Sequence, residues 1–391
     1  MGGHDALDFA SLVLGHLQPG LSTEKATPRD FNIQPGFVTA YPKSASKFDR
    51  DQTFINAVAG AFDRRVLALA ARTIIELNVR NAYFNTRVGL PSPVCQMTPP
   101  LRIAQIAPLH ERVPPKLYGG TERVVSFLTE ELVRQGHDVT LFASGDSKTS
   151  AQLVRCCEMA LRLNPSVRDA LPYHMVMLDE VRRRIDQFDV LHFHIDVLHA
   201  PLIRDIADRT LTTLHGRLDL PDLAPFYAAF RELPLASVSN DQREYLRNVN
   251  WLGTTYHGLP RGLLPFQPNA DGYLAFLGRI APEKCPDRAI QIAALSGMPL
   301  KIAAKVDRAD QAYWENVIRP MVEAYPDVEF IGEIDENDKA GFLGGAVALL
   351  FPIDWPEPFG LVMIEAMACG TPVIAHRRGS VPEIIEENIS G

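Results

Sequence analysis

The sequence lacks the features that mark membrane-spanning and secreted proteins. None of its apolar runs approaches the roughly 18 residues that a transmembrane helix needs. The N-terminus has no basic segment of a signal peptide and no myristoylation signal. The five cysteines are odd in number and contain no Cys-x-x-Cys. We therefore expect free thiols in a cytoplasmic protein, with at most peripheral contact at the inner membrane face.

Positive charge and nucleotide-cofactor motifs are also scarce. The formal net charge is −8, and this acidic balance argues against nucleic acid as a partner. No Gly-x-Gly-x-x-Gly follows the first predicted strand of either half of the chain, which disfavours a nicotinamide-dependent dehydrogenase.

Residues 1–98 do not belong to the pattern that the rest of the chain follows. Apolar residues at helical spacing over 51–83 and a shorter run over 6–17 predict a helical or partly disordered N-terminal extension, followed by a proline-rich linker. Arginines beside the apolar face of 51–83 would also suit a membrane surface or a partner helix. A helical hairpin packed on the main body is the simpler interpretation.

From Leu101 the pattern alternates between strands and helices, which predicts an α/β protein with parallel sheets. Predicted strands of the first half are 101–106, 138–143, 189–194, 211–214, 235–239 and 251–256, with helices over 122–135 and 241–249. The second half has five predicted strands, 273–277, 300–304, 328–331, 346–351 and 372–375. Ligands of such sheets bind at the carboxyl ends of the strands, where polar residues collect in this sequence.

The most informative stretch is the helix predicted from Gly360 to Cys369. Its residues are apolar on every face except for Glu365, so we expect a helix buried all round. A buried carboxylate needs a partner or a ligand, and the helix entrance at Gly360 is itself a site for an anion. Glu357 lies on the loop before that entrance. Two carboxylates beside an anion pocket suit a nucleotide sugar, with its hydroxyl groups and phosphates.

The run EPFGLVMIEAMACGTPVIA, residues 357–375, resembles the signature of the family 4 retaining glycosyltransferases of the GT-B fold, and the resemblance extends over about 101–391. It implies two Rossmann-like, doubly wound domains that face a cleft. Residues 99–262 would form the acceptor-side domain and 263–391 the donor-side domain. The pattern stops at Gly391, where the family continues. Either the donor-side domain is incomplete because the coding sequence is truncated, which we favour, or residues 1–98 replace the missing elements.

The resemblance also implies roles for individual residues. Arg279 and Lys284, five apart at a strand-to-helix turn, would bind the donor diphosphate without a metal ion or other cofactor, as would the glycine loop at Gly119 and Gly120. His215 would contact the transferred sugar, together with Glu357 and the backbone of Phe359, Gly360 and Leu361. Glu365 would bind the ribose. We expect His215, Glu357, Arg279 and Lys284 to be catalytic.

The expected reaction is metal-independent transfer of a hexose, favouring a UDP-glucose type of donor, with retention of anomeric configuration. Small-molecule, glycan and lipid-linked acceptors remain open. A glycosidase using Glu357 and Glu365 is disfavoured by the phosphate-binding residues. A non-catalytic nucleotide-sugar binder is the alternative from another class, given the early end of the pattern.

Two local features leave further questions. His192-Phe193-His194 places two rings on one face of a strand and is a weak metal motif, because no further ligand follows at useful spacing; a substrate-facing or hydrogen-bonded role is favoured. Tyr256-His257-Gly258-Leu259-Pro260 stands where the family shows Asn-Gly-hydrophobic-Asp. The departures at His257 and Pro260 weaken any assignment of acceptor or hinge contacts there.

Overall fold

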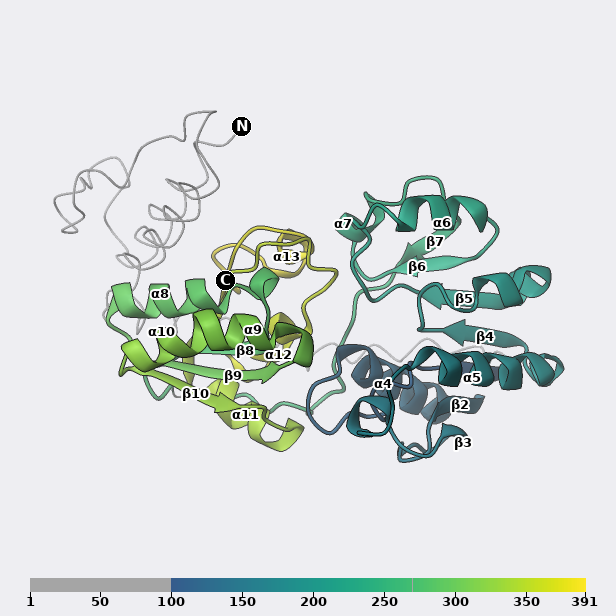
Figure 1. Cartoon of the computed structure of the whole chain (residues 1–391), viewed down its shortest axis with the longest axis horizontal. Coiled ribbons are helices and arrows are strands. Elements are labelled where there is room, and N and C mark those ends of the chain that lie inside the picture. The colour runs from purple at the N-terminus through teal and green to yellow at the C-terminus, as the bar shows by residue number, and fades with distance from the viewer. Residues whose placement is uncertain (1–99, 269) are drawn as a thin grey trace, which may run out of the picture.

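The computed structural model describes residues 100–268 and 270–391. The predictions made for the N-terminal extension, residues 1–98, lie outside these ranges. The described chain forms two parallel β-sheets, each with its own apolar core, that lie side by side (Figure 1). The predicted division at 262/263 falls in the segment between the last strand of the first sheet and the first strand of the second.

The first sheet has seven strands in the order β3-β2-β1-β4-β5-β6-β7. Its strands are β1 (Arg102–Ile106), β2 (Asp138–Ser144), β3 (Gln152–Cys157), β4 (Val190–Phe193), β5 (Thr210–Thr213), β6 (Leu235–Ser237) and β7 (Trp251–Thr254). Six of them were predicted, with ends one or two residues different. The prediction missed β3, because this edge strand is only half buried and so carries no continuous apolar run.

The helices of the first half are α4 (Gly120–Arg134), α5 (Leu171–Arg183), α6 (Leu223–Ala229) and α7 (Asn240–Arg243). Helix α4 agrees with the predicted helix over 122–135. The helix predicted over 241–249 is wrong in length, since α7 ends after one turn. The buried Leu246 lies outside the helix, where its carbonyl accepts a hydrogen bond of 2.7 Å from the indole of Trp251, the first residue of β7.

The second sheet has five strands in the order β10-β9-β8-β11-β12, the number predicted. They are β8 (Tyr273–Ile280), β9 (Leu300–Val306), β10 (Val328–Gly332), β11 (Ala346–Phe351) and β12 (Val373–Ala375). The helices are α8 (Pro286–Ser296), α9 (Gln311–Tyr313), a π-helical turn (Trp314–Ile318), α10 (Arg319–Ala324), α11 (Glu336–Gly344), α12 (Leu361–Cys369) and α13 (Val381–Ile384). Short 3-10 turns occupy 161–163, 185–187, 200–202, 204–209, 282–284 and 308–310.

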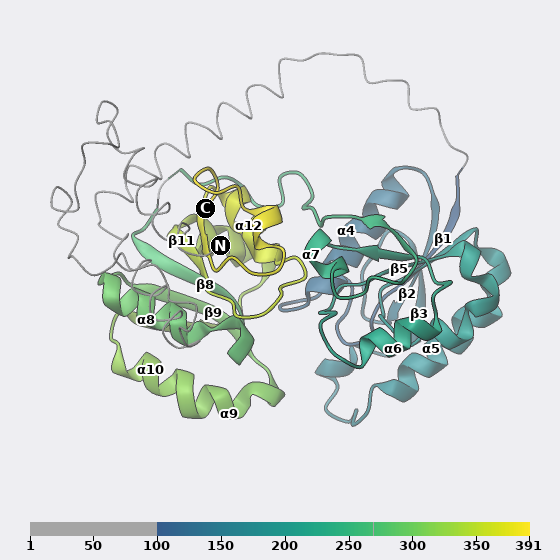
Figure 2. The same cartoon turned by 90° about the horizontal axis from the view of Figure 1, so that it is seen from above.

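Helix α12 lies beside β11 and the edge strand β12 (Figure 2). It begins after Gly360 and ends before Gly370, both in left-handed conformation, as the sequence predicted. The prediction that this helix is buried on every face is wrong. Met363, Glu365 and Ala366 are buried, but Ala368 is exposed, because the described residues cover only the flank of α12 that faces the sheet and α11. Among the described helices, none is long and apolar enough to cross a membrane.

Candidate active site

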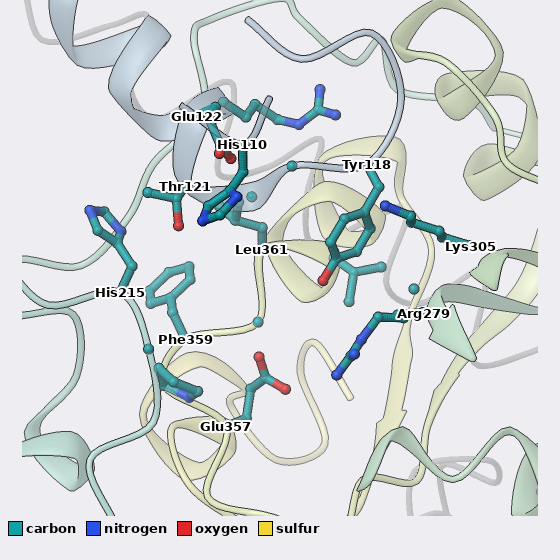
Figure 3. Close-up of a pocket in the computed structure, with 18 of the residues that line it drawn as sticks. His110, Tyr118, Thr121, Glu122, His215, Arg279, Lys305, Glu357, Phe359 and Leu361 are labelled. Carbon is teal, nitrogen blue, oxygen red and sulfur yellow. The ribbon is translucent and has the colours of Figure 1, made fainter. Parts of the chain in front are cut away.

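A cleft of about 660 Å³ lies between the two sheets, at the carboxyl ends of their strands. Residues from both halves of the chain line it (Figure 3). The cleft brings together every residue expected in the site, namely Gly119, Gly120, His215, Arg279, Lys284, Glu357, Phe359, Gly360, Leu361 and Glu365. The outermost two, Gly119 and Glu365, are 246 positions apart in the chain, so the fold brings these residues together.

The glycine loop brings two helix entrances together across the cleft. Gly119 has φ +147°, and a Cβ there would lie 2.8 Å from Cβ of Pro115, so no side chain fits. A Cβ on Gly120 would lie 3.7 Å from Cδ1 of Leu361, the first residue of α12. The starts of α4 and α12, with the positive ends of their helix dipoles, therefore lie close together at the cleft, which favours an anion there.

Arg279 and Lys284 line the cleft, but each is paired with carboxylates. Arg279 donates to Asp310 over 2.8 Å and to Glu283 over 2.5 Å. Lys284 donates to Glu357. The guanidinium and ammonium groups are thus held in place by acidic neighbours, and a bound diphosphate would have to compete with or share these pairs.

The loop that carries Glu357 is fixed on several sides. Its carboxylate is almost fully buried and accepts a hydrogen bond of 2.8 Å from the indole of Trp355, besides that from Lys284. Gly379, at φ +56°, packs against its backbone so closely that a Cβ would lie 2.3 Å from the nitrogen of Glu357. The glycine is therefore required for the position of this carboxylate.

Four histidine rings form a row in the first of the two α/β halves, residues 99–262. His192 lies 4.1 Å from His194, His194 lies 5.1 Å from His215, and His215 lies 5.2 Å from His257, measured between ring centroids. Burial lowers the pKa of His192 and His257 to about 4 and the pKa of His194 and His215 well below 6.5. The row is therefore neutral at physiological pH.

Hydrogen bonds fix the proton positions in this row. Nε2 of His194 donates to the side-chain oxygen of Gln105 over 2.8 Å, which leaves its Nδ1 as an acceptor. Nδ1 of His194 lies 2.9 Å from Nε2 of His215, so Nε2 of His215 must carry a proton to donate to it. The ring of His192 forms a hydrogen bond with the hydroxyl of Thr213.

In the described part of the chain, no group of three or more His, Cys, Asp or Glu side chains could hold a metal ion.

Some residues of the cleft and its surroundings were not foreseen. Gln105 could have been found, since it interrupts the apolar run Ile103-Ala104-Gln105-Ile106 inside the predicted strand 101–106. Lys339, which pairs with Glu365, gives no such signal, because its burial depends on how α11 packs against α12. Contacts between the two halves, such as Arg123 with Glu336, likewise depend on the tertiary arrangement.

Two family models match most of the described chain. Residues 118–252 match "Glycosyltransferase Family 4" and residues 266–391 match "Glycosyl transferases group 1". A phosphatidyl-myo-inositol mannosyltransferase of Propionibacterium freudenreichii is 27% identical over 298 residues, which cover 66% of this chain and 73% of that protein. A D-inositol 3-phosphate glycosyltransferase of Mycobacterium tuberculosis is 33% identical over 127 residues, 32% of this chain and only 26% of that protein.

Solved glycosyltransferase structures share the fold. Sucrose-phosphate synthase from Thermosynechococcus elongatus superposes with a TM-score of 0.59 at 21% identity, covering 72% of this chain and 82% of that one. Anabaena Alr3699/HepE, determined in complex with UDP-glucose, has a TM-score of 0.53 at 16% identity, covering 73% and 83%. With both halves matched by family models and both sheets arranged as in these structures, the chain belongs to the family 4, group 1 type of glycosyltransferases and has the GT-B fold.

Proposed function

We propose that this glycosyltransferase moves a hexose from a nucleotide-diphosphate sugar, UDP-glucose by preference, to an acceptor hydroxyl with retention of anomeric configuration and without a metal ion. The observation that carries the proposal is the meeting of Arg279, Lys284 and the entrance of α12 in one cleft with His215 of the opposite half. This set combines donors for a diphosphate with groups for a sugar. The binding of UDP-glucose by Alr3699/HepE is in keeping with it.

The donor would lie mainly against the second half of the chain, residues 263–391. Arg279, Lys284 and the N–H groups at Gly360 and Leu361 would hold the diphosphate. Glu365, in the second turn of α12, would accept hydrogen bonds from the ribose hydroxyls. Glu357 would bind the transferred sugar, together with backbone groups around Phe359.

Catalysis would rest on charge that is already in place before the bond breaks. As the glycosidic bond of the donor lengthens, negative charge gathers on the leaving diphosphate oxygen. Arg279, Lys284 and the start of α12 stabilise this charge, which takes the place of a metal ion. The acceptor would attack from the same face as the leaving group, whose phosphate oxygen receives the acceptor proton. Residues 99–262 would bind the acceptor, a small molecule, a glycan or a lipid-linked precursor.

Isothermal titration calorimetry with UDP, GDP and ADP in EDTA tests the proposal. We expect saturable binding of one nucleotide, weakened at least tenfold in an Arg279→Ala, Lys284→Ala double variant. Arg319→Ala, which removes an exposed arginine of α10, is the matched control and should bind like the parent chain. Absence of binding by all three nucleotides would refute the donor site and leave the non-catalytic alternative.

A further inference from the structure

His257 lies between the two halves of the chain and contacts an aromatic ring of each. Its ring stacks on His215 with 5.2 Å between centroids and an interplanar angle of 18°. Its other neighbour is Phe359, whose ring it meets in an edge arrangement at 4.9 Å and 60°. The position of the His257 ring is thus set by one residue of the first half and one that directly precedes α12.

The polar atoms of His257 are not engaged by this packing. Within residues 100–268 and 270–391, no hydrogen bond or ion pair joins either of its ring nitrogens to another residue, in contrast to His192, His194 and His215. The side chain is only partly buried and forms part of the cleft wall. A ring that is fixed in place with a free donor and a free acceptor is prepared to bind a ligand.

The charge state of the ring selects the class of ligand. Burial lowers the pKa of His257 to about 4, so the imidazole is neutral near pH 7, with one N–H and one lone pair. A phosphate would prefer the cations at Arg279 and Lys284. A sugar hydroxyl, which both donates and accepts, matches a neutral imidazole.

We propose that His257 is a substrate-binding residue that recognises a hydroxyl group of the transferred sugar, so that His215, His257 and Glu357 together surround that sugar. The inference rests on the function proposed above, because it takes the sugar to lie beside Phe359. It assigns a role to a position where the sequence departs from its family, which the resemblance could not supply.

His257→Phe is the sharpest test, because it keeps an aromatic ring between His215 and Phe359 while removing both nitrogens. We expect the affinity for the free nucleoside diphosphate to stay within twofold of the parent chain. The affinity for the nucleotide sugar should fall roughly 2- to 12-fold, the range for one lost hydrogen bond. His257→Asn, which restores a donor and an acceptor, should recover part of the loss. Tyr173→Phe, an exposed ring of α5 outside the cleft, is the control.

Donor analogues that each lack one hydroxyl identify the group that is recognised. The analogue that lacks the recognised hydroxyl should bind equally well to the parent chain and to His257→Phe. Each of the other analogues should bind more weakly to His257→Phe than to the parent chain. Equal affinities of the two proteins for every nucleotide sugar would overturn the role of His257 and leave the donor site intact. A parent chain that binds no nucleotide at all would instead refute the proposed function, and this inference would fall with it.

Discussion

Lys339 of α11 donates a hydrogen bond of 2.7 Å to Glu365 of α12, and both side chains are almost fully buried. Burial lowers the pKa of Lys339, and the adjacent Glu365 carboxylate partly opposes this shift. Nζ of Lys339 also lies 3.4 Å from Oε2 of Glu336, and the Glu336 carboxylate forms an ion pair with Arg123 of the opposite half. The orientation of the carboxylate proposed to bind the ribose is therefore set by an ion-pair network that joins both halves.

Breaking this pair from one side should be costly. Lys339→Met leaves the carboxylate of Glu365 buried without its cation, so we expect the free energy of unfolding to fall by about 3–5 kcal/mol in urea denaturation. The double variant Lys339→Met, Glu365→Leu removes both charges and should recover most of that loss. Losses that simply add in the double variant would show that the two side chains do not depend on each other.

Gln105 should matter to the site although it lies behind the cleft wall. Gln105→Leu removes the acceptor that fixes the proton of His194 and, through it, that of His215. We expect the free energy of unfolding to fall by about 1–3 kcal/mol, and nitrogen NMR should show mixed tautomers of His194 and His215. Gln152 is an exposed residue of the edge strand β3, and Gln152→Leu should change neither the free energy of unfolding nor the tautomers. Unchanged tautomers in Gln105→Leu would contradict the assigned proton positions.

The buried histidines predict loss of stability in mild acid. The pKa is about 4 for His192, about 3 for His199 and well below 6.5 for His194 and His215, so the unfolded chain binds more protons as the pH falls below about 6.5. Glu122 and Asp196 act oppositely, since burial raises the pKa of Glu122 to about 7 and that of Asp196 to about 6, and their contributions grow as the pH falls toward 4.5.

Because the four buried histidines outnumber these two carboxyl groups, the free energy of unfolding should decrease by at least about 1.4 kcal/mol per pH unit between pH 6 and pH 4.5. Urea unfolding at a series of pH values measures the slope, and His199→Gln should reduce it. A stability that is flat or rises on acidification in this range would show that the histidines are not held neutral.

The features that were predictable from the sequence are those that local patterns determine. The strand β11, a continuous apolar run, was predicted with its observed bounds, and α12 was predicted within a residue between Gly360 and Gly370. The prediction for β8 ended three residues early, at 277 instead of Ile280. The residues expected in the site were placed at the ends of strands or at helix entrances, and the parallel topology then brings them into one cleft.

The features that were not predictable depend on packing between distant segments. The half-exposed β3 has no distinctive pattern. Asp310, one of the two carboxylate partners of Arg279, and Glu357, the partner of Lys284, lie 31 and 73 residues away in the chain. The contact of His257 with Phe359 similarly joins segments that no local pattern connects. Such pairings follow from the tertiary arrangement, within one half as well as between the halves, which a periodicity in the sequence does not encode.

Glu383 of α13 links the two halves of the chain directly. Its carboxylate accepts hydrogen bonds of 2.7 Å from the backbone nitrogens of Asn240 and Asp241, and of 2.8 Å from the hydroxyl of Tyr256. All three donors belong to the first half of the chain, whereas α13 follows the donor-side elements. The carboxylate thus favours the arrangement in which the cleft is formed.

Removing this link should shift the molecule toward more open arrangements. The bonds lie near solvent, so we expect Glu383→Ala to weaken the closed arrangement by only about 1 kcal/mol, or roughly fivefold in population. Small-angle scattering of the ligand-free variant should give a larger radius of gyration, and the affinity for the nucleotide sugar should fall by no more than this factor, in proportion to the fraction of closed molecules. Glu387→Ala breaks an ion pair with Arg377 within the same half and serves as the control. If both variants scatter like the parent chain, contacts such as Arg123 with Glu336 suffice to hold the halves together without Glu383.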